Sequence, residues 1–213
     1  MAKGKVITVA QQKGGAGKTT LAVNLGVTLM RDGLRVAVID TDPQGSLGRW
    51  FMTRREARDD PGVEFATASA WGVNYECEKL RNAADVVIVD TPPKADADLR
   101  PALREADLVL VPVASSHVDL WATEGVLDLA RRAGKPALVV LNRARARTRL
   151  GAEVAAAAAE LGAEVAQPQI ANRVAYAQSL GDGLGAAEAP GVAPALRDEL
   201  AALAALVRAR LEI

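Results

Sequence analysis

Short apolar runs alternate along the chain with segments in which apolar residues recur every three or four positions. Most of the runs are continuous, a pattern typical of strands buried on both faces of a parallel sheet. Strands are predicted at residues 6–10, 34–39, 63–66, 85–90, 107–113, 137–141 and 164–169. Helical periodicity predicts helices at residues 21–31, 47–58, 74–84, 121–133, 150–161 and 195–213. The alternation predicts an α/β protein, with a mostly parallel twisted sheet and helices on both of its faces.

The composition fits one compact domain over residues 1–213. Half of the 213 residues are hydrophobic, which is enough for a sizeable core. No apolar stretch approaches the roughly 18 residues of a membrane span, and the first five residues lead directly into a strand, so we expect a cytoplasmic protein. The single cysteine, Cys77, cannot form an internal disulfide or hold a metal cluster by itself. The formal net charge is zero, so binding to nucleic acid requires a local basic patch.

A glycine-rich turn joins the first predicted strand to the first predicted helix. Residues 12–20 read Gln-Lys-Gly-Gly-Ala-Gly-Lys-Thr-Thr. Glycines let backbone N–H groups point at phosphate oxygens, and the start of a helix adds a partial positive charge behind them. Lys18 can then reach the β- and γ-phosphates, and the Thr19 hydroxyl can coordinate Mg²⁺. The standard phosphate-loop pattern fails at its first position, which is Gln12, but a second lysine, Lys13, follows it. A plain glycine-rich turn with exposed lysines is the alternative.

Acidic residues end two of the other predicted strands. Asp40 and Asp42 lie in the segment Asp-Thr-Asp-Pro-Gln, and Asp90 ends the run at 85–90. Ligands of open α/β sheets bind beyond the carboxyl ends of the strands, so these carboxylates should lie beside the glycine turn. Asp90 has the Walker B arrangement and would hold Mg²⁺ through water. An Asp-Pro turn at a strand end is the simpler interpretation of the first segment.

Together these motifs resemble those of the ParA/MinD family of deviant Walker A P-loop ATPases, whose signature is K-G-G-x-G-K-[ST] followed by D-x-D-P-Q. The resemblance implies the P-loop NTPase fold, with ATP and Mg²⁺ as cofactors. It implies that Lys13 reaches the γ-phosphate of the partner subunit in an ATP-sandwich homodimer. It also implies that Asp40 supports the metal and that Asp42 serves hydrolysis. The expected phosphate contacts are Lys13, Gly14, Gly15, Ala16, Gly17, Lys18, Thr19 and Thr20, with Thr19, Asp40 and Asp90 at the metal and Lys13, Lys18 and Asp42 as catalytic residues.

Two later segments indicate which nucleotide base the protein recognises. Asn142 and Arg143 end a strand where GTPases carry Asn-Lys-x-Asp, and the fourth position here is Arg145, so guanine loses its acidic partner and adenine is favoured. Asn142 matches the base-contacting asparagine of the ParA/MinD family. Residues 171–176 resemble the family's R-x-R-x-A-Y segment, with Arg173 present and the first arginine replaced by alanine. We therefore expect Asn142, Arg143 and Arg173 at the nucleotide.

Four arginines lie within seven residues and have no acidic residue among them: Arg143, Arg145, Arg147 and Arg149. Such a cluster can neutralise several phosphates in an otherwise neutral protein, so we interpret it as part of a DNA-binding patch. A solvated loop or helix start is the alternative. The C-terminal segment 195–213 has no aromatic residue and opposes anionic lipid with three acidic side chains, so a packed helix is expected rather than a membrane anchor.

The resemblance implies a short ParA-like ATPase without an N-terminal helix-turn-helix domain. Such a protein dimerises on MgATP, binds nonspecific DNA on the nucleoid, and hydrolyses ATP slowly until a ParB-like or other adaptor stimulates it. Its cargo would be a plasmid, a chromosome region or a protein assembly. A MinD-like membrane-cycling regulator is one alternative. A P-loop enzyme acting on a small metabolite, such as a dethiobiotin-synthetase-like ligase, is another, against which Lys13 and the Asp-Thr-Asp-Pro-Gln segment argue.

Overall fold

The structure, a computed structural model, describes residues 3–93, 96–114, 117–144, 149–160 and 162–213. Strands β1 to β7 span Lys5–Val9, Val36–Asp40, Glu64–Thr67, Val86–Asp90, Leu108–Ala114, Ala137–Asn142 and Glu164–Val165. Helices α1 to α8 span Lys18–Arg31, Ser46–Ala57, Val73–Leu80, Asp96–Glu105, His117–Arg132, Arg149–Glu160, Val174–Gly181 and Pro194–Leu211. Two short 3₁₀ helices, η1 and η2, span Ala70–Gly72 and Ala186–Glu188.

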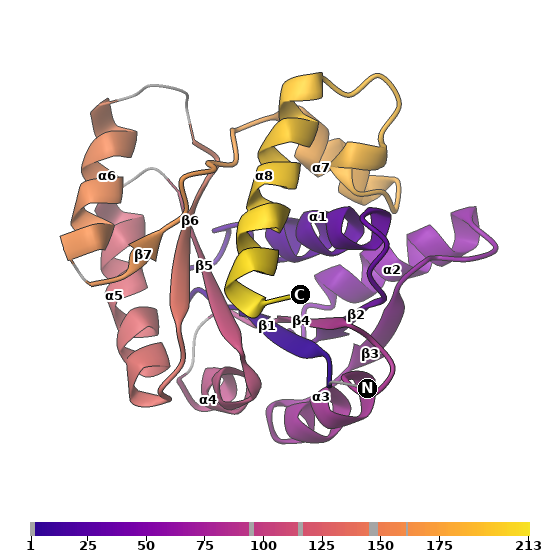
Figure 1. Ribbon diagram of the computed structural model, residues 1–213, viewed down its shortest axis with the longest axis horizontal. Helices are drawn as coiled ribbons and strands as arrows, with labels where there is room; N and C mark the ends of the chain where they lie inside the picture. Colours follow the sequence, from indigo (N-terminus) through magenta and orange to yellow (C-terminus); the bar gives the residue numbers. More distant parts are fainter. Residues whose placement is uncertain (1–2, 94–95, 115–116, 145–148, 161) are drawn as a thin grey trace.

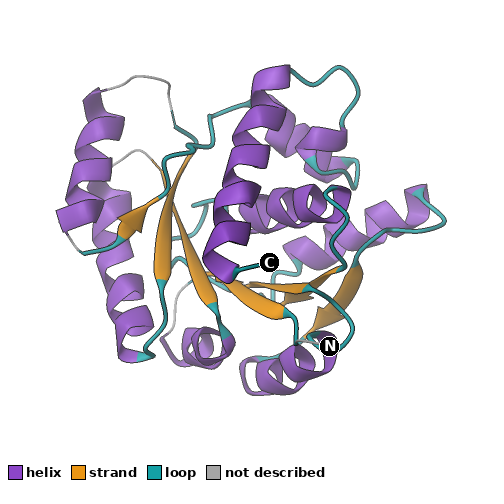
Figure 2. Cartoon of the chain, in the orientation of Figure 1, coloured by secondary structure: helices purple, strands orange, loops and turns teal. Residues whose placement is uncertain are grey.

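The strands form one parallel sheet in the order β3-β2-β4-β1-β5-β6-β7. Helices cover both of its faces (Figures 1 and 2). Alternate residues of each strand enter different layers: Ile7 and Val9 pack with α1, α2, α7 and α8, whereas Val6 packs against α3 and α4. Helices α4, α5 and α6 pack on the same face as α3, over strands β5 and β6. The predicted fold class, a single α/β domain, is confirmed.

The sheet register brings the acidic strand ends together. Asp90 is the register partner of Val9 on one side and of Asp40 on the other. The glycine turn begins three residues after Val9, so the phosphate loop and both carboxylates lie at the carboxyl edge of three adjacent strands. A shift of one residue in either strand would turn these side chains to the opposite face of the sheet.

The C-terminal helix is packed as expected. Leu196, Leu200, Leu203, Val207 and Leu211 of α8 are buried in the core that also contains α1. In the described part of the chain, no helix is both long and apolar enough to span a bilayer.

The structure differs from the predicted elements in a few places. Helix α4 was not predicted, because Pro101 lies inside it and proline usually ends a helix. Helix α7 is too short for its periodicity to be recognised in a window of about 11 residues. The strand expected at 164–169 is only Glu164–Val165, since Pro168 has no N–H for the ladder.

A buried ion pair joins α2 to the segment before α8. The Arg54 side chain is fully buried and the Glu188 side chain is 8% exposed, with Nη1 to Oε2 at 2.8 Å. Arg54 also donates to the carbonyl oxygens of Pro61 and Gly183, and its guanidinium lies 5.4 Å from the centre of the Trp50 ring. The Trp50 indole N–H donates to the Leu184 carbonyl oxygen at 3.2 Å. These contacts fix α2 against the C-terminal part of the chain.

Replacing Arg54 with alanine should destabilise the protein strongly, because Glu188 would keep a buried charge with only a partial partner in Arg58, 3.2 Å away. We expect a loss of about 3 kcal/mol or more in the free energy of unfolding, measured by urea denaturation. The neighbouring Arg55 is exposed, so Arg55→Ala should change stability by less than about 0.5 kcal/mol. Equal effects of the two substitutions would contradict the structural role of the buried pair.

Candidate nucleotide-binding site

The glycine turn forms an open loop between β1 and α1. Gly15 and Gly17 have φ angles of 77° and 88°, a left-handed conformation that disfavours other residues. A Cβ atom on Gly17 would lie 2.3 Å from Nδ2 of Asn142. That same Nδ2 donates to the Ala16 carbonyl oxygen at 2.9 Å. Asn142 therefore holds the loop closely from the end of β6, an arrangement that only glycine at position 17 permits.

Gln11 supports the same loop from the other side. Its side chain is fully buried, and Oε1 accepts a hydrogen bond from the Gln12 N–H at 2.9 Å and from the Lys13 N–H at 3.5 Å. Its Nε2 donates to the Pro112 carbonyl oxygen and to the Thr123 hydroxyl. The backbone of Lys13 is thus tied to β5 and α5. Gln11 was not predicted as a site residue. The only signal for it in the sequence is its position, as a polar residue directly before the motif where the apolar strand ends.

Asp90 and Thr19 form the centre of the site. The Thr19 hydroxyl donates to Asp90 Oδ2 at 2.6 Å. Asp90 is 1% exposed, and its other oxygen, Oδ1, is buried and accepts no hydrogen bond from the described residues. Burial raises the pKa of Asp90 to about 7, against the hydrogen bond from Thr19 that favours the charged form. A buried carboxylate oxygen without a donor, next to a hydroxyl, fits the ligand preferences of Mg²⁺.

Lys18 lies in the same electrostatic environment. Burial lowers the pKa of its ammonium group, while Asp90 and Asp42 act in the opposite direction. The described residues contain no group of three or more His, Cys, Asp or Glu side chains that could hold a metal ion unaided. A divalent cation at Asp90 and Thr19 would therefore complete its coordination with phosphate oxygens and water.

The aspartates of the Asp-Thr-Asp-Pro-Gln segment differ in their surroundings. Asp40 is buried; its Oδ1 accepts from the Asp42 N–H at 3.0 Å and its Oδ2 from the Gly48 N–H at 2.8 Å. Burial raises the pKa of Asp40, and these backbone donors oppose the effect. Asp42 is partly exposed, with Oδ1 accepting from the Gln44 N–H. Asp40 therefore shapes the turn and the start of α2, while Asp42 lies at the surface of the site.

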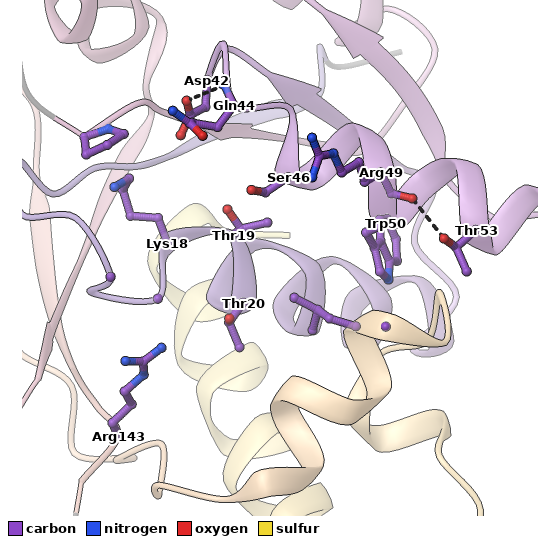
Figure 3. A pocket seen from close by; sticks show the side chains of 15 residues that line it. Lys18, Thr19, Thr20, Asp42, Gln44, Ser46, Arg49, Trp50, Thr53 and Arg143 are labelled. Atoms are coloured by element: carbon purple, nitrogen blue, oxygen red, sulfur yellow. Dashed lines mark hydrogen bonds between the residues drawn. The ribbon is translucent and has the colours of Figure 1, made fainter.

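A cavity of about 510 Å³ opens beside the loop (Figure 3). Of the residues expected at the site, it is lined by Gly15, Gly17, Lys18, Thr19, Thr20, Asp42 and Arg143. Further lining residues were not predicted: Gln44, Ser46, Arg49, Trp50, Thr53, Pro93, Leu180 and Gly181. Most of these come from α2 and α7, so only the packing of distant segments brings them to the phosphate loop.

A second cavity, of about 290 Å³, adjoins the first. Thr20 and Arg143 line both, and Asn142, Asn172, Arg173 and Tyr176 are among the other residues that line the second. Arg173 and Tyr176 are held in place by Glu199 of α8, which accepts hydrogen bonds from both. Two adjoining cavities that share Thr20 suit a ligand with a phosphate part on one side and a ring system on the other.

Five expected site residues lie next to these cavities without lining either of them: Lys13, Gly14, Ala16, Asp40 and Asp90. The arginine cluster is described only in part. Arg143 adopts φ 54° and points toward the phosphate loop in Figure 3, so it belongs to the cavity region. Arg145 and Arg147 lie outside the described residues, and of Arg149 only the backbone is described, at the start of α6.

A parallel sheet with a glycine loop, a lysine, a hydroxyl and a buried carboxylate at its carboxyl edge defines a P-loop nucleotide-binding protein. Residues 7–186 match the model of the CobQ/CobB/MinD/ParA nucleotide-binding domain, and the chain belongs to this family. Within the family, the similar proteins are ATPases of the ParA, Soj and McdA type, which partition or position cargo.

Individual relatives cover most of the chain. Maintenance of carboxysome distribution protein A of Halothiobacillus neapolitanus is 31% identical over 193 residues, which are 86% of this chain and 88% of that protein. Protein ParA of Rhizobium radiobacter is 30% identical over 181 residues, 80% of each chain. An ATP complex of a Cyanothece McdA variant has the same fold, with a TM-score of 0.80 at 19% identity, covering 100% of this chain and 98% of that one. The MinD cell division protein of Aquifex aeolicus superposes with a TM-score of 0.78 at 19% identity, over 96% and 97% of the two chains.

Replacing Asp90 with asparagine should distinguish the effect of its buried charge on stability from its role in binding Mg²⁺. The pKa of Asp90 is raised in the folded protein, from an ordinary value of 3.8 to about 7, so its contribution to stability is present below pH 4 and is lost as the pH rises through 7. At pH 8 without nucleotide, Asp90→Asn should therefore be more stable than the wild type by about 1–4 kcal/mol, and the difference should shrink at pH 5.

The same variant should lose most of the additional stabilisation that Mg²⁺ gives to the ATP-bound wild type at pH 8. Urea denaturation at both pH values, with and without Mg²⁺, measures each quantity. Asp32→Asn, at an exposed position beyond α1, is the control and should behave as the wild type. An undiminished Mg²⁺ effect in Asp90→Asn would show that the carboxylate does not serve the metal.

Proposed function

We propose that this protein is an ATPase that binds MgATP across the two adjoining cavities, closes into an ATP-sandwich homodimer, and binds nonspecific DNA in that state. It would use this cycle to partition or position a plasmid, a chromosome region or a protein cargo. The observation that supports this most directly is the pair Thr19 and Asp90, with the unpartnered Asp90 Oδ1 beside the glycine loop.

In this proposal the phosphates lie over the loop residues 14–20. The N–H groups of the loop and the start of α1 bind phosphate oxygens, and Lys18 neutralises charge on the β- and γ-phosphates. Thr19 and Asp90 hold the cation, Asp90 through water. Asp40 supports the metal site indirectly, because both of its oxygens are used by backbone N–H groups that shape the neighbouring turn. When bound, Mg²⁺ offsets phosphate charge and orients the γ-phosphate.

Asp42 and Lys13 carry the catalytic part of the proposal. Asp42 is partly exposed in the cavity lining, where it can accept a hydrogen bond from the attacking water and orient it. Lys13 does not line the cavity, and its backbone is tied to Gln11. This supports a role for Lys13 toward the γ-phosphate held by a second copy of the chain, where it would stabilise the developing charge.

The second cavity is the proposed site of adenine and ribose. Asn142 already donates to the loop and accepts from the Arg143 N–H, so its amide orientation is set before a base arrives. Arg143 lines both cavities and can contact the nucleotide where they meet. Arg173, held by Glu199, also lines this cavity.

The family supports the proposed partner and location. Its members include proteins named for carboxysome distribution and, as Soj, for chromosome partitioning, which supports a positioning role on nucleoid DNA in the cytoplasm. Arg143, Arg145, Arg147 and Arg149 are the proposed DNA contacts. A ParB-like or other adaptor would stimulate an otherwise slow hydrolysis and release the dimer. We propose no stable membrane association, since the apolar face of α8 is packed in the core.

Lys13→Ala should uncouple nucleotide binding from dimerisation. With Mg²⁺ and ATP, the wild type should sediment as a dimer in analytical ultracentrifugation, and with ADP as a monomer. Lys13→Ala should bind ATP with an affinity within about tenfold of the wild type and remain a monomer, because only the contact across the interface is lost. Lys3→Ala, at an exposed site, is the control. Dimerisation of Lys13→Ala like that of the wild type would refute the trans role.

Duplex DNA of arbitrary sequence should be bound with ATP or a slowly hydrolysed analogue, and not with ADP. In a double variant, Arg145→Ala with Arg147→Ala, the slope of log affinity against log salt should fall in magnitude by about two, since each phosphate contact contributes about one. Fluorescence anisotropy at several salt concentrations measures this, with anionic liposomes titrated in parallel. Binding to liposomes in place of DNA would instead favour a membrane-cycling regulator of the MinD type.

A further inference from the structure

A small arginine-lined cavity lies between α4 and α5, outside the nucleotide site. Its volume is about 190 Å³, and its lining consists of Arg100, Leu103, Arg104, Leu129, Arg132 and Ala133. None of these residues lines either nucleotide cavity. We propose that this cavity binds one phosphate-class oxyanion, as a second anion site of the protein.

The position of the cavity follows from the topology. Helix α4 ends three residues before β5 begins, and α5 ends five residues before β6 begins. The ends of both helices therefore lie toward the amino ends of these strands, whereas the phosphate loop lies at the carboxyl edge. Figure 1 shows α4 and α5 on the face of the sheet opposite α1. The two anion sites would lie at opposite edges of one sheet.

The described residues balance the charges in this cavity only in part. Arg100 and Arg104 lie four residues apart on α4, and within the described ranges neither takes part in an ion pair or a hydrogen bond. Like charges at this spacing destabilise a helix. Arg132 is oriented by Asp128, at 2.7 Å, and that carboxylate also contacts Arg131 at 3.6 Å. Within the described part of the chain, the lining contains no acidic residue.

The remaining lining residues add to the effect of the arginines. Arg100, Arg104 and Arg132 are exposed, and the lining between them includes the buried Leu103 and Leu129, at 1% and 7% exposure. Electrostatic attraction to an anion is stronger at such a boundary than in open water. Guanidinium forks match phosphate oxygens in a bidentate geometry. The cavity is smaller than the roughly 300 Å³ of sites for drug-sized ligands, so it suits one phosphoryl group rather than a whole nucleotide.

Two sources could supply such a group: a free phosphate-class anion or a phosphate of the DNA backbone. The test uses the protein with its nucleotide site saturated by MgADP, so that the phosphate loop is already occupied. Sodium phosphate is titrated against sodium chloride of equal ionic strength, and the melting temperature is recorded. A double variant, Arg100→Gln with Arg104→Gln, is compared with the wild type. A second double variant, Arg55→Gln with Lys3→Gln, changes the net charge equally at exposed basic residues outside the cavity and is the matched control.

Phosphate at several times its dissociation constant should raise the melting temperature of the wild type and of the control by about 2–4 °C, and the Arg100/Arg104 variant should lose this gain. Without phosphate, that variant should melt no lower than the wild type, because like charges have been removed. A lower melting temperature in the absence of phosphate would indicate a structural role for the arginines and overturn the proposal.

In the second arm, duplex DNA is titrated in the ATP state at several salt concentrations. A salt slope that is reduced in the Arg100/Arg104 variant but not in the control identifies backbone phosphate as the source. An unchanged slope with loss of the phosphate effect identifies a free anion. Unchanged behaviour in both arms overturns the site. The phosphate arm is independent of DNA binding, so failure of the proposed function and failure of this inference give different results.

Discussion

Burial of one carboxylate at the carboxyl edge of the sheet is the constraint on which the candidate site depends. Asp90 is almost inaccessible, accepts one hydrogen bond from Thr19, and has one oxygen that receives no hydrogen bond from the described residues. An uncompensated buried carboxylate destabilises the folded state, which appears here as a pKa raised to about 7. The rest of the fold must supply enough stability to hold this group in place. A ligand that brings a cation to Asp90 would compensate this buried charge and so stabilise the folded state.

Buried polar side chains around this centre are used to hold backbone rather than to face solvent. The Gln11 side chain connects the loop to β5 and α5, and Asn142 holds the loop from the end of β6. Asp40 accepts hydrogen bonds from the turn that carries Asp42 and from the start of α2. Because loops at a sheet edge have few internal hydrogen bonds, such anchors fix their shape in advance. The site is therefore largely organised before nucleotide binds, and Arg54 extends this organisation to α2.

The two edges of the sheet have different electrostatic characters. At the carboxyl edge, Lys18 lies near Asp42 and Asp90, so positive and negative groups occur together there. Toward the amino edge, Arg100 and Arg104 lie together without an acidic partner in the described part of the chain. A net charge of zero conceals this separation. This separation of charge gives the domain chemically distinct surfaces at the two edges of one sheet.

Much of the molecule was determined by local sequence. Continuous apolar runs are sufficient for parallel strands, and the segments at 12–20 and 40–44 impose their turns through glycine and through Asp-Pro, whatever surrounds them. The seven strands and six of the eight α-helices that the structure describes, the fold class and the family followed from these features. Helix α4 escaped recognition because the local signal of Pro101 opposes a helix that packing against the sheet stabilises.

Other features were decided only by tertiary structure. Arg49, Thr53 and Leu180 reach the site from segments up to 131 residues apart, and no local pattern marks them. The burial of Asp90, the pairing of Arg54 with Glu188 and the meeting of α4 and α5 at three arginines depend on which helices lie side by side. The physical reason is range: turns and helices follow from neighbouring residues, whereas burial and charge pairing arise from contacts that the chain makes only when its distant parts pack together.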